Sequence, residues 1–336
     1  MTLDMPRPVS VDLTERVACD RLRAIRAVIL LAGSLRPRRL TRLTHRAIPE
    51  LPVDDRRCIL KIWQDQLANL LAARAGVGEH DEAAIDTRVL VNAGAPCPGT
   101  DVLAPAPRFD VERDPGEFRG TGGLLRDVAE AYDDDDHLLV ATASRVAFDP
   151  LAALVARLLD HDADVRVLAH PDGSPMEVYV VRCAALRQIP RLGYVDFKEQ
   201  ALPRIVERHR VAVIRRPRAL TPPVRTLGGY IKALRMVHCR RLAMAGRTPA
   251  PWARAFAITE PGATVDRGAM LHDSVVLAGG RVGAGATVVR SLVGPGAVVG
   301  AGESVVDRVV GHAEPNPGQS RRVPKGGPRA VPEDAA

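Results

Sequence analysis

Glycine and a small or branched apolar residue recur about every six residues near the end of the chain, between Ile258 and Gly311. The clearest copies read VGAGAT from Val282, VGPGAV from Val293 and VGAGES from Val299. An ordinary strand repeats every second residue and a helix about every 3.6, so neither explains this period. Repeats of this kind are typical of a parallel β-helix, in which each unit forms one face of a coil. The sequence therefore predicts about four stacked coils, with the branched residues pointing inward.

Segments before the repeats alternate between strands of the buried type and helices. The first strand, RAVILLAGS from Arg26, runs into a glycine turn, and the helix at 58–75 has apolar residues along one side. This alternation predicts an α/β domain with a parallel sheet, whose ligands bind beyond the carboxyl ends of the strands. The loops expected there are 33–44, 92–98, 120–123 and 142–146. The other expected elements are strands at 88–92, 137–143, 164–169 and 176–182, and helices at 121–132, 151–159, 197–208 and 228–247.

The length of 336 residues suggests two domains with flanking segments. No apolar run is long enough to span a membrane, and the first residues do not form a secretory signal. The five cysteines are scattered without CxxC spacing, so neither a zinc site nor a redox motif is indicated, which fits a reducing cytoplasm. We expect a leader at 1–25, the α/β domain at 26–245, the β-helix at 246–311 and a disordered tail at 312–336.

The net charge of +7 and the pI near 9.5 would suit an anionic partner. Much of the excess lies in arginine clusters around 36–42 and 215–218, which are either solvated or face phosphate-bearing ligands. Aromatic residues make up only 3% of the chain, which argues against a surface that stacks nucleic-acid bases. The basic residues form no stripe interleaved with aromatics, so a specific nucleic-acid partner is not expected.

A series of short motifs runs through the α/β part. It comprises AVILLAG from Ala27, RLTRLT from Arg39, LPV from Leu51, IWQDQL from Ile62, VLVN from Val89, GTGGLLR from Gly120, DFKEQALP from Asp196 and TLGGYIKA from Thr226. With coils behind it, this series resembles the sugar-nucleotide pyrophosphorylases, also called NDP-sugar synthases. The mannose-1-phosphate guanylyltransferase branch is the most similar. The resemblance covers roughly residues 26–311.

Members of that family join a nucleoside triphosphate to a sugar 1-phosphate and release pyrophosphate. The resemblance implies a Rossmann-like nucleotidyltransferase domain of the GT-A type, followed by a left-handed β-helix. A glycine turn after a strand offers backbone N–H groups to phosphates, and an arginine in the loop offsets their charge. Arg39 is the catalytic candidate in this series. The motifs place the nucleotide beside Ala32, Gly33, Ser34, Arg39, Gly120, Thr121, Gly122 and Gly123.

The chain departs from the family pattern where the metal binds. The resemblance implies one magnesium-binding aspartate where this chain has Ser144, and a second where it has Pro223. The opening loop has Ser34 and Arg36 in place of glycines, and no lysine lies near 48–50, where the family has one. Serine and proline do not replace carboxylates as Mg²⁺ ligands, and a metal normally offsets the charge in phosphoryl transfer. Whether the chain is an enzyme is therefore open.

Three functions follow as hypotheses. The first is a non-catalytic homologue that binds a nucleotide or nucleotide sugar, needs no cofactor, and regulates or scaffolds an assembly. Its coils would associate with another copy or with an active paralogue. The second is an active pyrophosphorylase with a rearranged Mg²⁺ site, in which Asp149 or Asp172 supplies the missing acid. The third is an acyltransferase with a general base from the coils, His272 or His312. We favour the first.

Overall fold

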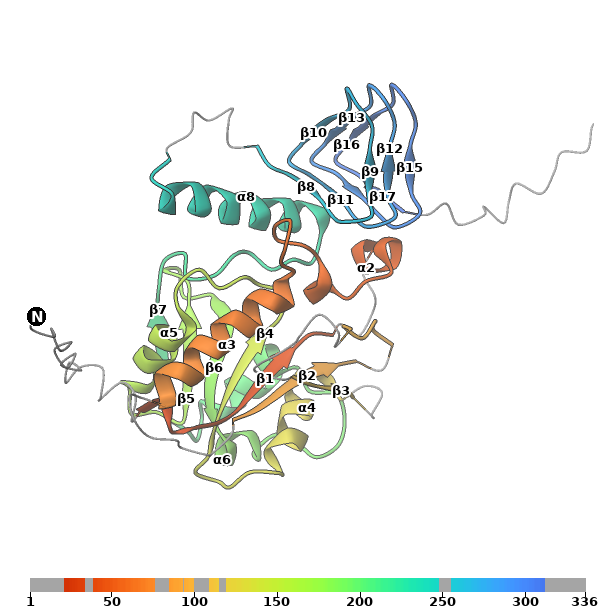
Figure 1. The fold of residues 1–336 in the computed structure, drawn as a ribbon. Coiled ribbons are helices and arrows are strands. Elements are labelled where there is room, and N and C mark those ends of the chain that lie inside the picture. The colour runs from red at the N-terminus through yellow and green to blue at the C-terminus, as the bar shows by residue number, and fades with distance from the viewer. Residues whose placement is uncertain are drawn as a thin grey trace, which may run out of the picture.

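A helix-flanked sheet and a column of short strands make up the molecule, with a long helix between them (Figure 1). The structure is a computed structural model. It describes residues 21–33, 39–75, 85–92, 94–99, 109–114, 119–247 and 255–311. Most of the predicted leader and the whole predicted tail lie outside these ranges. Leu22 and Ile25, at the end of the predicted leader, are buried in the core, so the fold includes them.

A seven-stranded sheet forms the first part, with its strands in the order β3-β2-β1-β4-β6-β5-β7. Every neighbouring pair is parallel except the two pairs that involve β6. The predicted strands correspond to β1, β2, β4, β5 and β6, and two further strands, β3 and β7, lie at the edges. The bounds are β1 (Ile25–Leu31), β2 (Asp86–Val91), β3 (Asp110–Arg113), β4 (His137–Thr142), β5 (Val165–Ala169), β6 (Pro175–Arg182) and β7 (Val211–Arg215).

The direction of β6 corrects the prediction of a parallel sheet. It pairs antiparallel with β4 on one side and with β5 on the other. A parallel crossover needs about a dozen residues or more, whereas β5 and β6 are joined only by residues 170–174. The His170 N–H donates to the Ser174 carbonyl (2.8 Å), which closes a hairpin. The sheet is therefore mixed, although parallel pairs dominate it.

Helices cover both faces of the sheet, and β1 shows how the sequence allows this. Val28 and Leu30 pack with α3 and α5, whereas Ala27 and Ile29 pack with α4 and α6. Since successive side chains point to opposite faces, a strand covered on both sides is apolar throughout. One helix expected at 197–208 is replaced by the shorter pair η3 and α7. The helices are α2 (Arg39–Thr44), η1 (Ile48–Glu50), α3 (Ile59–Ala75), α4 (Gly120–Ala129), α5 (Leu151–Leu159), α6 (Cys183–Leu186), η3 (Phe197–Ala201), α7 (Leu202–Ile205) and α8 (Leu227–Met244).

The column consists of many short parallel strands that form three sheets. One sheet has the order β17-β14-β11-β8, the second β15-β12-β9 and the third β10-β13-β16. Valines such as Val276, Val288 and Val305 fill the space between the sheets. The strands are β8 (Ala257–Thr259), β9 (Thr264–Val265), β10 (Met270–His272), β11 (Ser274–Val276), β12 (Arg281–Val282), β13 (Thr287–Val289), β14 (Leu292–Val293), β15 (Val298–Val299), β16 (Ser304–Val306) and β17 (Val309–Val310).

Each turn of the column takes 17 residues, since the backbone of Ser291 lies over Ser274. This is one fewer than three six-residue units, so the predicted period of about six holds, with one interval of five residues in each turn. Two corners of each turn use glycines with positive φ, such as Gly279 and Gly285. The third corner is instead formed by Asp273, Arg290 and Asp307, which have φ values of 49°, 46° and 54°.

The two parts share one apolar core. Ile231 and Leu234 of α8 belong to the same cluster as Leu277 and Leu292 of the column. The Arg46 guanidinium also donates to the Glu260 carboxylate (2.7 Å), which links the loop after α2 to the first turn of the column. The column is therefore packed against the α/β part.

Candidate functional site

A cavity of about 300 Å³ lies where the carboxyl ends of β1, β2 and β4 meet. This is the edge at which parallel α/β sheets bind their ligands. Ala32 and Gly33 follow β1, Asn92 follows β2, and Ser144 follows β4. The remaining lining residues are Leu31, Thr41, Ala47, Ile48, Ala95, Pro96, Gly120, Thr121, Thr142, Tyr194, Asp196, Val224 and Arg225.

Gly33 lies directly against the end of the neighbouring strand. A Cβ atom at this position would be 2.4 Å from the backbone nitrogen of Asn92 and 2.5 Å from its Oδ1. Only glycine fits this approach. The backbone of the first predicted loop and the amide of Asn92 therefore form one continuous wall of the cavity.

The second glycine-rich motif, residues 120–123, forms the start of α4, and its four residues make different contacts. Gly120 and Thr121 line the cavity. The N–H groups of Gly122 and Gly123 donate instead to the carbonyl of Val195, at 2.8 and 3.4 Å. A Cβ on Gly122 would approach that carbonyl to 2.9 Å. Gly122 therefore allows close packing of the segment that carries Tyr194 and Asp196 into the cavity wall, whereas a Cβ on Gly123 would meet the Arg119 side chain.

Asp196 stands at the cavity edge and is already engaged by hydrogen bonds. Its Oδ1 accepts from the Glu199 N–H (2.9 Å) and so caps η3, while the Thr121 hydroxyl donates to its Oδ2 (3.3 Å). Thr121 also accepts from the Phe197 N–H (2.9 Å). Thr121 and the loop that begins at Asn92 were expected at this edge of the sheet, whereas Asp196 and Tyr194 were not. An Asp in N-cap position before FKEQ was the available signal for Asp196.

The two positions at which the family resemblance implies metal-binding carboxylates come together at the cavity. The Val224 N–H, next to Pro223, donates to the Ser144 carbonyl (2.7 Å). The Ser144 hydroxyl is buried and has no hydrogen-bond partner among the described residues. The position of an expected carboxylate is thus taken by a short neutral side chain with an unused donor.

One acid does lie near this point, and two arginines hold it. Glu177 Oε2 accepts from Arg145 Nε (3.2 Å) and its Oε1 from Arg225 Nη2 (2.7 Å). Arg145 is buried and also donates to the Thr221 carbonyl (3.0 Å). Burial raises the pKa of the nearby Tyr179 hydroxyl, and the charge of Glu177 adds to this effect. The cluster of Arg145, Glu177 and Arg225 carries one positive charge in excess.

These residues do not fit a divalent metal. Mg²⁺ binds hard oxygen ligands, usually one or two carboxylates together with phosphate. Ser144 and Pro223 bring no carboxylate, and both oxygens of Glu177 are occupied by guanidinium groups. Asp196, the one carboxylate in the described lining, already accepts from the Glu199 N–H and the Thr121 hydroxyl. Over the described ranges, no group of three or more His, Cys, Asp or Glu side chains is placed to hold a metal ion.

The other candidate residues lie away from the cavity or outside the described ranges. Asp149 pairs with Arg216 (3.4 Å) and Arg240 (3.6 Å), and Asp172 accepts from the N–H (2.9 Å) and hydroxyl (2.7 Å) of Ser174. His272 is half-exposed on β10. The backbone of Arg39 begins α2, and its side chain is not described. Ser34 and His312 are not described either.

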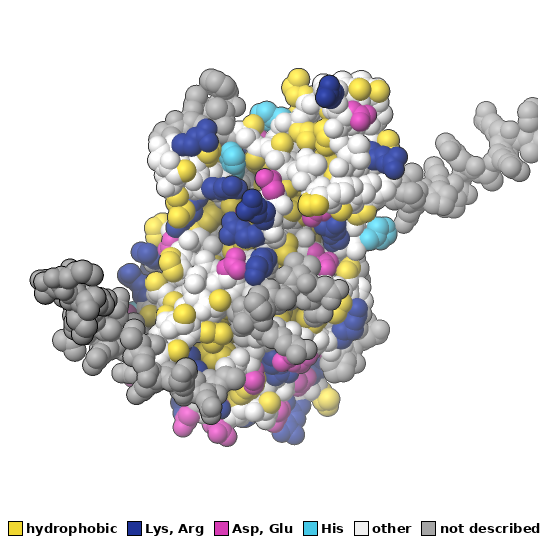
Figure 2. Space-filling view, in the orientation of Figure 1, with side chains coloured by type: hydrophobic (Ala, Val, Ile, Leu, Met, Phe, Trp, Pro, Cys, Tyr) yellow, Lys and Arg dark blue, Asp and Glu magenta, His cyan; other side chains and the backbone are white. Residues whose placement is uncertain are grey.

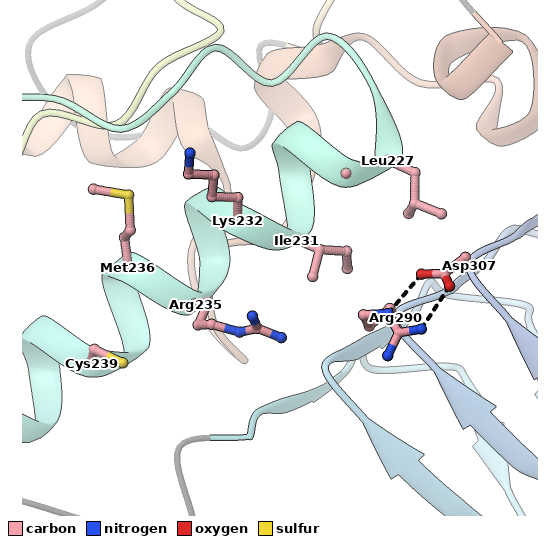
Figure 3. Close-up of a pocket in the computed structure, with 9 residues that line it drawn as sticks. Leu227, Ile231, Lys232, Arg235, Met236, Cys239, Arg290 and Asp307 are labelled. Carbon is pink, nitrogen blue, oxygen red and sulfur yellow. Dashed lines mark hydrogen bonds and ion pairs between the residues drawn. The ribbon is translucent and has the colours of Figure 1, made fainter. Parts of the chain in front are cut away.

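A larger hollow, of about 680 Å³, lies between α8 and the column (Figure 3). Leu227 and Ile231 project from α8 toward the column and form an apolar wall (Figure 3). The Arg290 guanidinium makes two hydrogen bonds with Asp307 on the opposite side, at 2.7 and 2.6 Å. Arg235, which also lines this hollow, pairs with Asp273. We assign this hollow to the junction of the two parts and the smaller cavity to the candidate site.

On the face in Figure 2, several Lys and Arg side chains gather around α8, and elsewhere they are interspersed with acidic and apolar side chains. Of the helices in the described ranges, none combines the length and apolar character needed to cross a membrane.

Comparisons with known proteins leave the family of this chain unassigned. No protein-family model matches it, and no curated protein is similar enough to count as a match. Among solved structures, the crystal structure of HddC from Yersinia pseudotuberculosis is similar over 63% of this chain and 100% of its own, with 12% sequence identity and a TM-score of 0.45. A similarity of this size assigns neither a family nor an activity.

Proposed function

We propose that this chain is a non-catalytic homologue of the sugar-nucleotide pyrophosphorylases, and that it binds a nucleotide or nucleotide sugar at the sheet edge. In this proposal it acts as a regulatory or scaffolding partner. The column would wind left-handed, as hexapeptide coils do, and would associate with another copy or with an active paralogue. Met270 and Val306, exposed on the sheet β10-β13-β16, would contribute to that contact.

The proposal depends most on one observation, the hydrogen bond between Val224 N–H and the Ser144 carbonyl. It brings the two expected metal positions together at the cavity, and neither Ser144 nor Pro223 carries a carboxylate. Transfer of a nucleotidyl group concentrates negative charge, which a metal normally offsets. The cavity keeps the features that binding alone requires, namely an open strand edge, backbone glycines and polar groups at Asn92 and Thr121.

Calorimetry with GTP, GDP-mannose, UDP-glucose and dTDP-glucose tests binding, and a pyrophosphate-release assay with the same nucleotides and sugar 1-phosphates tests turnover. We expect at least one nucleotide or nucleotide sugar to bind and no pair to release pyrophosphate. Asn92→Ala should weaken binding about three- to tenfold, because it removes one side-chain hydrogen-bonding group from the cavity. Asn69→Ala is the matched control, since Asn69 is exposed on α3.

Pyrophosphate release with any pair of nucleotide and sugar 1-phosphate would contradict this proposal and would favour an active enzyme with a rearranged metal site. An equal loss of binding in Asn92→Ala and Asn69→Ala would show that the ligand does not bind in the cavity.

A further inference from the structure

Arg225 is the one cation in the described lining of the cavity, and it lies near the place where the resemblance implies a metal. Arg225 lines the cavity, and 45% of its side-chain surface is exposed. Within the described part of the chain its guanidinium makes one hydrogen bond, from Nη2 to Glu177. A guanidinium has five N–H donors in a planar fork, which matches the oxygens of a phosphate. Most of its donors are thus available to a ligand.

Glu177 accepts hydrogen bonds from both Arg145 and Arg225. Its single negative charge orients Arg225 but does not neutralise both arginines. Its backbone has a φ of 61°, a left-handed conformation that is costly for a residue with a side chain. Strain of this kind persists where the surrounding contacts fix it, and here Arg145 does so from the buried side. Because Arg145 already balances the charge of Glu177, Arg225 keeps its positive charge within this cluster, and the nearest carboxylate in the cavity lining is that of Asp196.

Ser144 also lines the cavity, and its hydroxyl is buried without a hydrogen-bond partner among the described residues. An unpaired buried hydroxyl costs free energy that a hydrogen-bond acceptor on a ligand would recover. Pairing it with a phosphate oxygen would satisfy both groups.

We propose that Arg225 and Ser144 form a phosphoryl subsite, which binds the diphosphate of a nucleotide sugar without a divalent cation. This inference rests on the proposed function and names its ligand class. A nucleotide sugar carries less negative charge than a nucleoside triphosphate, so it suits a cavity lined by one guanidinium, Arg225, and one carboxylate, Asp196, better than a triphosphate does. Bidentate, charge-assisted hydrogen bonds from Arg225 would then offset the phosphate charge that a metal normally offsets.

The test measures binding of GDP-mannose, UDP-glucose and inorganic pyrophosphate in Mg²⁺ and in EDTA, by calorimetry and by ³¹P NMR. We expect the affinities of bound ligands to agree within about twofold in the two buffers. Arg225→Gln should weaken binding about 10- to 100-fold, and Ser144→Ala several-fold, since hydrogen bonds to charged groups are the stronger class. Arg225→Lys should recover part of the loss. Arg208→Gln, which removes one charge from an exposed arginine of the turn after α7, should change nothing.

Arg225→Gln leaves Glu177 paired with Arg145, and unchanged thermal unfolding would show that the variant is folded. Nucleotide-sugar binding that requires Mg²⁺, or that is indifferent to Arg225→Gln, overturns the subsite but leaves the proposed function standing. Pyrophosphate binding that is lost in Arg225→Gln, without binding of GDP-mannose or UDP-glucose, overturns the assignment of the subsite to a nucleotide sugar. Failure of all three ligands to bind overturns the subsite, while the proposed function is decided separately by calorimetry with GTP.

Discussion

Gly120 shows how one residue without a side chain shapes the cavity wall. Its φ is +71°, and a Cβ there would lie 2.4 Å from the Val195 carbonyl oxygen. We expect Gly120→Ala to lower the free energy of unfolding by about 2 kcal/mol or more, because it combines backbone strain with a clash against backbone. Urea denaturation measures the change.

The matched control is Gly228→Ala in α8, where nothing lies within 4 Å of the added methyl group. That variant should be as stable as the parent or up to about 1 kcal/mol more stable, since alanine is the better helix former. Equal effects at the two glycines would contradict the role of the Val195 contact.

Single residues also show what the sequence could reveal of the site. Ser144 and Pro223 could be located from motif order alone, and the structure brings their segments together. Glu177 and Arg225 could not be found in this way, because they are distant in sequence. They meet because β6 pairs with β4 and the Val224 N–H donates to the Ser144 carbonyl after β4. The binding roles of Ala32, Gly33, Ser34, Arg39, Thr121 and the glycines 120, 122 and 123 stay predictions.

Two aspartates at equivalent corners of the column have the same left-handed backbone conformation, but Asp273 is buried and Asp307 is exposed. Their contributions to stability can therefore be compared directly. Asp273 is 2% exposed, pairs with Arg235 of α8 and accepts from the Phe256 N–H (3.2 Å). Asp307 occupies the equivalent corner, is 60% exposed and pairs with Arg290. We expect Asp273→Ala to cost about 2 kcal/mol and Asp307→Ala about 1 kcal/mol or less, because only the first leaves a buried group, the Phe256 N–H, without its partner.

Thermal and urea unfolding of the two variants measure this difference. Both carry the same strain of alanine in a left-handed corner, so that term cancels in the comparison. Similar losses at the two corners would mean that the contact with Arg235 contributes little to stability.

At the scale of elements, periodicity was a good guide to strands and helices but a poor one to direction and corner chemistry. The helix at 151–159 and the strand at 137–143 agree closely with α5 and β4. The antiparallel direction of β6 was encoded in the short connection 170–174 rather than in its apolar pattern. The 17-residue turn was obscured because Asp273, Arg290 and Asp307 form a corner without glycine.

The shared core makes a prediction for the whole molecule. Leu277 is fully buried in the cluster that also contains Ile231 and Leu234 of α8, and this cluster extends to Trp63 of α3. We expect Leu277→Ala to destabilise the α/β part as well as the column, by about 2–4 kcal/mol, in one cooperative transition.

Circular dichroism and Trp63 fluorescence in a Trp252→Phe background follow that transition, because the chain has two tryptophans. The two signals should shift together in Leu277→Ala and stay near the parent value in Val306→Ala, since Val306 is 43% exposed at the outer turn. Separate transitions in the two signals would show that the parts unfold independently.

The 17-residue turn restricts how evolution or engineering could alter the height of this molecule. Corner residues, stacked serines and inward valines return to the same place only after a full turn. A tandem copy of residues 274–290 would raise the column by one strand spacing, about 4.8 Å, with every ladder continued. A copy of one six-residue unit would instead shift all later residues to the wrong face. Permitted lengths of the column are therefore quantised, and insertions or deletions in it should survive only as whole turns.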